Sequence, residues 1–463
     1  HMFALGKTPS KQITQWHKET GPIYKINVGN QLWIMIGDPY LAHDIFVKSG
    51  STTSSRPYHR FNVEIYSKNN RGVVFGQYGS KWKSNRKAAT TTLSTVSIDK
   101  FKDVLELEIE NLMDQFTKIS QKGESVNPFK LLQMTSFNIV LTVALAHRFE
   151  EIDDPVYTYL HDSLEKGMAY GGIAGDLGSF IPLVSWTDKL TGLEEKLNEF
   201  IYCSRDLVYD KFISDALQNE KHSLLKDLYQ MKEDGLIDYD DIVVFLSDLV
   251  SAGADTIATT LSWTFNILSQ YPKVQEKVAK ELDEWKSKHP PGAVPNFHQD
   301  RDDFPYSVCV QKEIMRFRPV TNFGIPHVAT EDTLTNGYFI PKDAILISSM
   351  ETMHKSTAFY DDPEEFRPER FLQNTQRMSA AANAKINERD HFGFGWGRRQ
   401  CPGIHLAEIE IFNFYVRFFS KFTIQAEPDA QGNPKKIDLS EIIEEGIMVK
   451  PLPNKFIIVS RDV

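Results

Sequence analysis

A single cysteine near the end of the chain lies in a stretch whose residue types suit a metal-binding thiolate. Cys401 follows three glycines at alternating positions, which are Gly393, Gly395 and Gly397. A thiolate that binds a metal needs positive charge or amide donors beside it, and protection from water and oxidants. Glycines let the backbone turn tightly enough to bring N–H groups close to the sulfur. Gly403 lets the chain turn into a helix, whose N-terminal amides favour a nearby anion.

The spacing around this cysteine is specific. The pattern F-x-x-G-x-R-x-C-x-G is matched by Phe394, Gly397, Arg399, Cys401 and Gly403. A buried free cysteine in a glycine-rich loop is the simpler alternative. A zinc-thiolate site is a poorer one, because no second cysteine or suitably spaced histidine stands near Cys401. Through these positions the chain resembles the cytochrome P-450 family of haem-thiolate monooxygenases, eukaryotic microsomal type, and we expect a fungal source.

The resemblance implies a mainly α fold with a small β lobe, in which haem lies between a long central helix and the helix after the cysteine loop. It implies one catalytic domain over residues 1–463, with a β-rich lobe from about 20–50 and 320–350. Cys401 would be the axial ligand of haem b (iron protoporphyrin IX), where a thiolate favours O–O cleavage. Phe394, Arg399 and Gly403 would contact the cofactor.

A second candidate site lies inside the longest helical run, 239–270. The family pattern A-G-x-[DE]-T is matched by Ala252, Gly253, Asp255 and Thr256. Small residues let a flat ligand pass close to the backbone, and Gly253 weakens the helix locally. The resemblance implies cofactor contact for Ala252 and Gly253, and catalytic proton delivery by Asp255 and Thr256. The alternative is that Thr256 bonds the carbonyl four residues back and bends the helix without chemistry.

Trp82 and Arg86 stand four residues apart, so on a helix they share one face. Their spacing resembles the family helix that hydrogen-bonds a haem propionate, although an ordinary amphipathic helix with a surface arginine is the alternative. Three lysines make this helix a basic island on an acidic protein: Lys81, Lys83 and Lys87. A solvated face is the simple interpretation, but the family docks an acidic electron-donor domain on such a patch.

Glu313 and Arg316 form an E-x-x-R pair on a predicted helix, a spacing that is common on ordinary helices. Arg370, in the sequence P-E-R-F, resembles the family residue that joins this pair. We therefore expect Glu313, Arg316 and Arg370 to form a buried structural triad with no catalytic role. His327 resembles the residue that donates to a propionate, although a histidine on a strand is more often a satisfied surface residue.

The expected pocket residues are apolar or aromatic: Phe75, Val320, Phe323, Ile325, Ile447 and Met448. They suit a small lipophilic substrate such as a steroid, terpenoid or fatty acid. The expected reaction is insertion of one atom of O₂, as C–H hydroxylation or epoxidation. Electrons would come from NADPH through a separate NADPH-cytochrome P-450 reductase, with cytochrome b5 as a second candidate donor. Two alternatives remain, an enzyme of this fold that rearranges peroxides or dehydrates without O₂, and a non-catalytic haem sensor.

The composition limits partners and location. A net charge of −10 over 463 residues argues against a nucleic-acid binder. Three scattered cysteines do not make a disulfide framework, which indicates a reducing compartment. His1-Met2 resembles a cloning remnant, and no run of 18 apolar residues is present. The resemblance implies that an N-terminal anchor has been removed from a protein of the endoplasmic reticulum membrane, with the catalytic domain on its cytosolic face.

Several elements must position these residues. Periodicity and breakers predict helices over 9–20, 103–146 with a break near Gly123, 155–170, 193–217, 305–318 and 404–422. A hairpin is predicted over 23–37, and the stretches 51–79 and 372–388 are predicted to be loops. The linker before residue 193 carries apolar residues that suit either a membrane surface or buried packing. They are Phe180, Ile181, Leu183, Val184 and Trp186.

Overall fold

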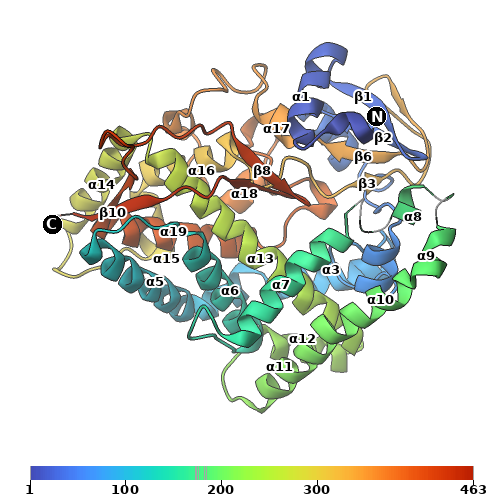
Figure 1. Ribbon diagram of the computed structural model, residues 1–463, viewed down its shortest axis with the longest axis horizontal. Helices are drawn as coiled ribbons and strands as arrows, with labels where there is room; N and C mark the ends of the chain where they lie inside the picture. Colours follow the sequence, from blue (N-terminus) through green and yellow to red (C-terminus); the bar gives the residue numbers. More distant parts are fainter. Residues whose placement is uncertain (1, 173–174, 176, 182, 184, 462–463) are drawn as a thin grey trace.

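One long helix runs through the middle of the protein. The computed structural model describes the chain apart from residues 1, 173–174, 176, 182, 184 and 462–463. Its longest helix, α13 (Tyr239–Leu268), crosses the centre of the molecule and packs against α6 (Phe129–Leu145), α16 (Pro305–Phe317) and α19 (Ile404–Lys421) (Figure 1). The predicted class, mainly α with a small β portion, is confirmed.

The sequence of α13 explains both its start and its burial. Asp238 accepts a hydrogen bond from the Asp241 backbone, and the Asp241 side chain accepts one from the Asp238 backbone, which is a capping box. The helix is long and apolar enough to cross a membrane, but 72% of its most apolar 18-residue window is buried inside the protein. It is therefore the core helix of the fold, with apolar residues on all sides.

The other long helices begin and end where prolines and glycines predict. Proline stands in the first turn of α1 (Pro9–Thr20), α7 (Pro155–Tyr170), α14 (Pro272–Lys286) and α16, where a missing N–H costs nothing. The helices are α1 (Pro9–Thr20), α3 (Ser80–Thr92), α5 (Lys102–Lys122), α7 (Pro155–Tyr170), α10 (Leu193–Ile201), α11 (Leu207–Gln218), α12 (Leu224–Glu233) and α14 (Pro272–Lys286), besides α6, α16 and α19.

Short helical turns occupy several connections. Those of the first half are η1 (Met2–Leu5), α2 (Pro39–His43), η2 (Asp44–Lys48), η3 (Arg60–Tyr66), α4 (Thr95–Ile98), η4 (Asp99–Phe101), α8 (Leu177–Phe180), α9 (Trp186–Thr191) and η6 (Tyr202–Asp206). Those of the second half are α15 (Phe297–Asp300), η7 (Arg301–Asp303), α17 (Met350–His354), η8 (Pro368–Phe371), α18 (Met378–Asn383), η9 (Ile386–Glu388) and η10 (Gly397–Arg399).

Two of these turns correct the sequence prediction of loops. The stretch 51–79 contains the wide helical turn η3, which buries Phe61, Val63 and Ile65. The stretch 372–388 contains α18, whose Met378 and Ala382 pack against Ile404 at the start of α19. Both segments have enough apolar residues for a turn of helix, but polar and glycine neighbours hide the periodicity.

Within the described part of the chain, the strands form four small sheets. The largest has the order β1-β2-β6-β3, where β1 (Ile23–Val28) and β2 (Gln31–Ile36) are an antiparallel hairpin. Strand β2 pairs in parallel with β6 (Ile345–Ser348), and β3 (His327–Val328) pairs antiparallel with β6. The other sheets are hairpins or pairs: β4 (Thr333–Thr335) with β5 (Tyr338–Ile340), β7 (Phe422–Ala426) with β10 (Phe456–Ser460), and β8 (Ile442–Glu445) with β9 (Met448–Pro451).

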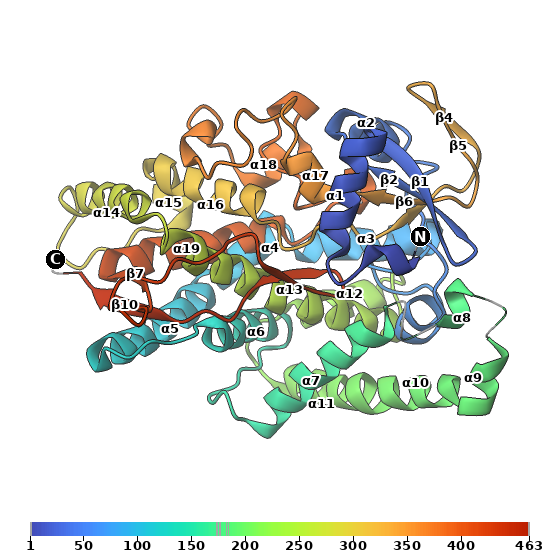
Figure 2. The same ribbon diagram turned by 45° about the horizontal axis from the view of Figure 1, so that its top comes forward.

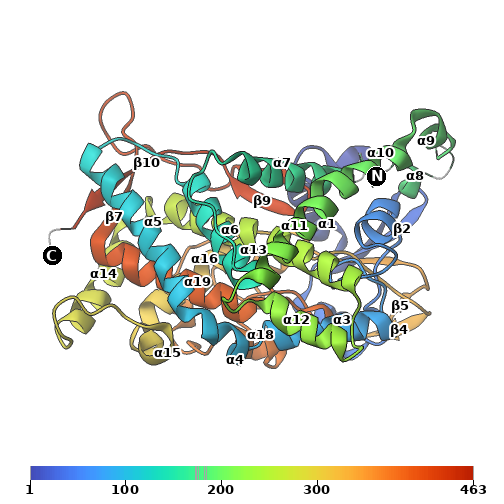
Figure 3. The same ribbon diagram turned by 90° about the horizontal axis from the view of Figure 1, so that it is seen from below.

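The helices form layers on the two sides of α13. Figure 2 shows α7, α10 and α11 along one side of the molecule, with α15, α17 and α18 on the other. Figure 3 shows α1 and β10 toward opposite ends of the long axis. In the linker after α7, Phe180 is buried against the largest sheet, whereas Leu183 and Trp186 are 83% and 62% exposed. Ile181 packs with Phe180, and Val184 lies outside the described residues.

Candidate functional site

The cysteine loop is shaped by its glycines and by the start of α19. The backbone N–H of Cys401 donates to the carbonyl of Phe394 at 2.9 Å, which closes the loop. Gly397 has φ +50°, and a Cβ there would lie 2.6 Å from the carbonyl oxygen of Phe46, so only glycine fits. The amide of Gly403, just before α19, donates to the sulfur of Cys401. The backbone N–H group that reaches the sulfur is therefore that of Gly403.

Cys401 lies in the interior of the fold, and its side chain nevertheless has accessible surface. Burial raises the pKa of its thiol, while the Gly403 amide and the Arg86 guanidinium act in the opposite direction. On α13, Ala252 is likewise exposed and Thr256 is partly exposed, although the residues on both sides of this stretch are buried. Interior residues thus present accessible surface both on α13 and at the start of α19, as a site for a large flat group requires.

Three arginines meet beside this space. Arg56 is buried and donates to the carbonyl oxygens of Val74 at 2.9 Å and Ile325 at 2.8 Å. Arg399 is buried and donates to three further carbonyl oxygens, those of Ser54, Val73 and Gly76. Arg86 donates to the carbonyl of Gln400, next to the cysteine.

These arginines repel one another. Burial first, and then the charge of Arg86, lowers the pKa of Arg56 to about 9. Burial, followed by Arg56 and Arg86, lowers the pKa of Arg399 to about 8. Among the described residues no carboxylate forms an ion pair with any of the three. Buried charges are normally paired, so this cluster fits a ligand that brings two negative charges.

Arg56 was missed in the sequence analysis. It lies in a polar stretch, Ser54-Ser55-Arg56-Pro57, and no spacing rule links it to the cysteine loop. Its partners at 325 and 326 are more than two hundred residues away in the chain. The only signal was an arginine before a proline in a segment without acidic neighbours, which is too weak to act on.

Trp82 and His327 lie beside the arginines, with their ring N–H groups already engaged. Trp82 donates from Nε1 to the carbonyl of Val73 at 3.0 Å, and the Arg399 guanidinium lies 4.1 Å from the centre of its ring system. His327 Nδ1 lies 2.7 Å from the carbonyl of Thr53. Burial and then Arg56 hold the pKa of His327 well below its usual value, so this ring is neutral. His327 is buried, and the alternative of a surface histidine is wrong.

The predicted proton-delivery pair is present, with each side chain bonded. Thr256 donates from its hydroxyl to the carbonyl of Ala252 at 2.7 Å, the bond that the sequence alternative described. Asp255 is buried and accepts a hydrogen bond of 2.6 Å from Nε2 of Gln133 on α6. The carboxylate therefore faces α6, whereas Thr256 is partly exposed.

Gly253 serves a different contact from the one expected. A Cβ at this position would lie 2.6 Å from Cγ2 of Val140 on α6. The helix continues through this residue without a break. The glycine thus permits close packing of α6 on α13, and the accessible surface of this stretch is provided by its neighbour Ala252.

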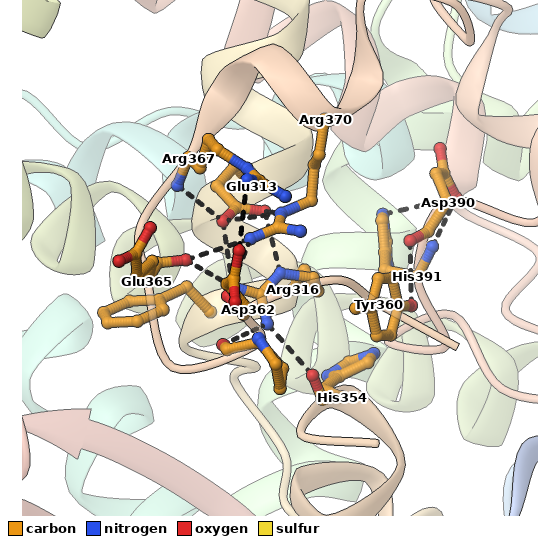
Figure 4. Close-up of polar contacts among 12 residues, drawn as sticks. Glu313, Arg316, His354, Tyr360, Asp362, Glu365, Arg367, Arg370, Asp390 and His391 are labelled. Atoms are coloured by element: carbon orange, nitrogen blue, oxygen red, sulfur yellow. Dashed lines mark hydrogen bonds and ion pairs between the residues drawn. The ribbon is translucent and has the colours of Figure 1, made fainter. Parts of the chain in front are cut away.

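In the predicted triad, Glu313 and Arg316 are fully buried and Arg370 is partly buried. Arg316 forms a two-pronged ion pair with Glu313, with nitrogen–oxygen distances of 2.7 and 2.8 Å, and Arg370 Nε reaches the same carboxylate at 3.0 Å (Figure 4). Arg316 also donates to the carbonyl oxygens of His354 and Pro363, both at 2.9 Å. These bonds tie α16 to the chain around η8.

The expected pocket residues of the segment after α16 lie on connections to sheets. Val320 accepts a hydrogen bond of 2.8 Å from the backbone of Val449 on β9. Phe323 forms a bridge with Ser349 and packs against the core of the largest sheet. Ile325, partly buried, offers its carbonyl to Arg56.

The remaining pocket candidates come from the other side of the fold. Phe75 makes an edge-to-face contact with Tyr66, with ring centres 5.7 Å apart. Ile447 is 46% exposed at the turn before β9, and Met448 is buried.

Comparison with known proteins decides the family. The family model "Cytochrome P450" matches residues 1–458. The chain belongs to the cytochrome P-450 family. A cytochrome P-450 monooxygenase of Mycosarcoma maydis is 26% identical over 98% of this chain and 83% of its own. A flavonoid 3'-monooxygenase of Crocosmia x crocosmiiflora is 28% identical over 87% of this chain and 79% of its own.

Solved structures show the same fold. A zebra fish cytochrome P-450 solved with abiraterone has a TM-score of 0.80 at 22% identity, covering 99% of this chain and all of its own. The predicted family is confirmed, and with it the enzyme class. The chain is a cytochrome P-450 monooxygenase, for which the family implies haem, a cysteine thiolate ligand and the use of O₂.

Proposed function

We propose that this monooxygenase binds haem b through the Cys401 sulfur and oxidises a small lipophilic substrate with electrons from NADPH. Arg56, Arg86 and Arg399, with the neutral His327, form the polar side of the haem site, and Phe394 and Gly403 complete the loop around the sulfur. The observation that carries this proposal is the arginine cluster beside an accessible cysteine: Arg56 and Arg399 are buried, and none of the three arginines pairs with a carboxylate of the described residues. Two propionates would offset the repulsion among them.

The haem supplies the activation of O₂ and the insertion of one oxygen atom into the substrate. The side chains of this protein supply binding, orientation and protons. Thr256, whose hydroxyl oxygen is on the accessible stretch of α13, is the residue to which we assign proton delivery. Asp255, the preceding residue, is assigned to the same proton-delivery pair, and its carboxylate accepts a hydrogen bond from Gln133. The triad of Glu313, Arg316 and Arg370 is assigned a structural role.

The substrate class rests on the apolar candidates around the accessible space: Phe75, Val320, Phe323, Ile325, Ile447 and Met448. We propose a steroid, terpenoid or fatty acid. One zebra fish cytochrome P-450 structure was solved with abiraterone and another with progesterone, which supports a flat lipophilic ligand.

The electron donor we propose is NADPH-cytochrome P-450 reductase, with cytochrome b5 as an additional donor. Lys83 and Lys87 on α3 are exposed and suit an acidic partner. Lys81 is engaged by Asp238 and Asp241 and contributes little to such a surface. We further propose that the protein acts at the endoplasmic reticulum membrane, cytosolic face, where the exposed Leu183 and Trp186 suit a lipid surface.

A reduced, CO-bound absorbance spectrum of the haem-loaded protein tests the ligand. A Soret band at the long wavelength of thiolate ligation is expected, and Cys401→Ser should abolish it. Cys203→Ser, which changes an exposed cysteine outside the site, is the matched control. A Cys401→Ser variant that keeps the band would overturn the assignment.

The reaction class needs a second measurement. Steroids, terpenoids and fatty acids are added to the ferric protein, and those that shift its spin state are incubated with NADPH, reductase and ¹⁸O₂. One labelled oxygen atom in the product is expected. Product formed without NADPH or O₂ would instead support the peroxide-rearranging or dehydrating alternative, and absence of any product with every spin-shifting compound would support a haem sensor.

A further inference from the structure

A buried carboxylate on α13 holds the segment that carries Phe75. Asp248 Oδ2 accepts hydrogen bonds from the backbone N–H groups of Val73 at 2.9 Å and Val74 at 3.3 Å, and Oδ1 accepts one from the Tyr66 hydroxyl at 3.1 Å. A Cβ on Gly72 would lie 2.7 Å from Asp248 Oδ2, so this approach requires glycine. The segment Gly72–Phe75 is therefore fastened to α13 by one side chain.

Asp248 lies on the same face of α13 as the accessible stretch. Residues four apart share a helix face, so Asp248, Ala252 and Thr256 form one stripe. At a rise of 1.5 Å per residue, Asp248 lies about 6 Å along the axis from Ala252 and about 12 Å from Thr256. The segment that it holds thus contacts α13 about one helical turn before the accessible Ala252.

The same segment also contacts the arginine cluster. The carbonyl of Val73 accepts hydrogen bonds from Trp82 and Arg399, both at 3.0 Å, and the carbonyl of Val74 accepts one from Arg56 at 2.9 Å. The peptide group between residues 73 and 74 is therefore bonded to Asp248 of α13 through its N–H and to Trp82 and Arg399 through its carbonyl.

Several described groups that titrate or carry charge face Asp248. They are Tyr66 on η3, which is partly buried, Tyr209 on α11, which is buried, and the cation Arg205 on η6. Burial raises the pKa of Asp248 to about 6, against the opposing effects of the two backbone N–H groups, Tyr66 and Arg205. The free-energy cost of desolvating the charged carboxylate is thus larger than the stabilisation that its hydrogen-bond donors and Arg205 provide.

The residues just before this segment, which we call its outer end, are held to the start of α13 by ion pairs. Lys68 pairs with Asp240 at 2.9 Å, and Arg71 pairs with Asp238 at 3.1 Å. Hydrogen bonds from Arg71 and the Asp241 backbone outweigh partial burial and hold the pKa of Asp238 well below its usual value. The Arg71–Asp238 pair therefore remains charged across the pH range in which Asp248 titrates.

We propose that Asp248 is a positioning residue that makes the closure of segment Gly72–Phe75 on α13 depend on its own protonation. The segment closes tightly when the carboxyl is neutral and loosens at its inner end when the carboxylate is ionised, while the outer ion pairs keep the segment attached. The position of Phe75, and hence access to the pocket of the proposed function, changes with it.

The direction of the pH dependence follows from the linkage between proton binding at Asp248 and closure of the segment. An open segment exposes Asp248 to water, where its pKa returns toward 3.8, whereas the closed segment keeps it near 6. The closed state therefore binds the proton more tightly, and raising the pH through 6 favours opening. Between pH 5 and pH 8 the closing equilibrium should weaken about tenfold.

Hydrogen exchange of the haem-loaded protein, read by mass spectrometry on peptides that cover residues 72–76, tests this proposal. After correction for intrinsic exchange rates, the protection of these amides should fall about tenfold from pH 5 to pH 8 in the unmodified protein. Asp248→Asn keeps an acceptor oxygen and cannot ionise, so its protection should be the same at both pH values. Asp240→Asn, which alters the outer end only, is the control and should keep the pH dependence.

Protection in the unmodified protein that does not change between pH 5 and pH 8 would overturn the proposal, as would an Asp248→Asn variant with undiminished pH dependence. The unmodified pH series decides the matter even if the variant does not fold. The measurement uses neither substrate nor reductase, so it can fail while the proposed lipophilic substrate is confirmed, and the reverse.

Discussion

Gln133 holds Asp255 from behind the central helix. The 2.6 Å hydrogen bond from the amide of Gln133 joins α6 to α13 at the residue next to Thr256, and both side chains are buried. A buried carboxylate that loses its donor pays a desolvation cost that water cannot relieve. The bond therefore has a structural role whatever Asp255 does in the reaction.

Gln133→Leu should lower the free energy of unfolding by about 1–3 kcal/mol, because Asp255 is left buried with one donor fewer. Chemical denaturation followed by circular dichroism measures this change. The double variant Gln133→Leu with Asp255→Leu should recover part of the loss, since the unpaired acceptor is gone. No loss in the single variant would show that Asp255 turns to another donor.

Thr256→Ala should leave haem binding and the CO spectrum intact and should uncouple NADPH consumption from product formation. The hydroxyl is the proton-delivering group on the accessible face of the helix, and its removal changes little packing. Product formed per NADPH consumed is the quantity to measure. Thr260→Ala is the matched control, because Thr260 makes the same kind of bond four residues back, to Thr256, but is buried. Equal coupling in both variants would remove the assigned role.

Arg56→Gln should weaken haem retention while leaving the haem-free protein as stable as before or more stable. Without haem the three arginines repel one another, and removal of one relieves this repulsion. With haem the same change removes a partner of a propionate. Thermal unfolding with and without haem, and transfer of haem to apomyoglobin, give the two readouts. Arg71→Gln, on the same side of the fold but paired with Asp238, should leave haem transfer unchanged.

Arg370→Leu should destabilise the fold by about 1–3 kcal/mol, because the buried Glu313 carboxylate loses the hydrogen bond from Nε of Arg370 and keeps its pair with Arg316. Urea denaturation checks the magnitude. Arg367→Leu is a useful control, since that side chain is partly exposed and contacts Asp362 at 3.4 Å and the carbonyl of Asp361 at 3.2 Å. A cost below 1 kcal/mol for Arg370→Leu would mean that water enters and solvates the triad.

Local spacing predicted the groups that share one element. The cysteine pattern, the pair on α13 and the E-x-x-R pair lie within single helices or loops, and their spacing follows from helix geometry. Most long helices were predicted within a few residues of their observed ends because prolines and glycines mark them.

Contacts between distant segments were not predictable. Arg56 reaches Ile325, and Asp248 reaches Val73, across intervals that no periodicity describes. Gly253 was read as room for a ligand, whereas its neighbour is Val140 on another helix. The helical turn η3 was read as loop because its apolar side faces α10, a contact that is absent from the local sequence.

The parallel pairing of β2 with β6 also governs the order in which the chain can assemble. Trp33 lies opposite Ile345, so the first hairpin leaves the ribosome roughly 300 residues before its partner strand exists. Until then the edge of β2 has no protein partner for its backbone groups, and such an edge invites pairing with other chains. A nascent chain of this protein thus carries an unpaired strand edge for most of its synthesis, and a chain truncated before residue 345 never covers that edge with β6.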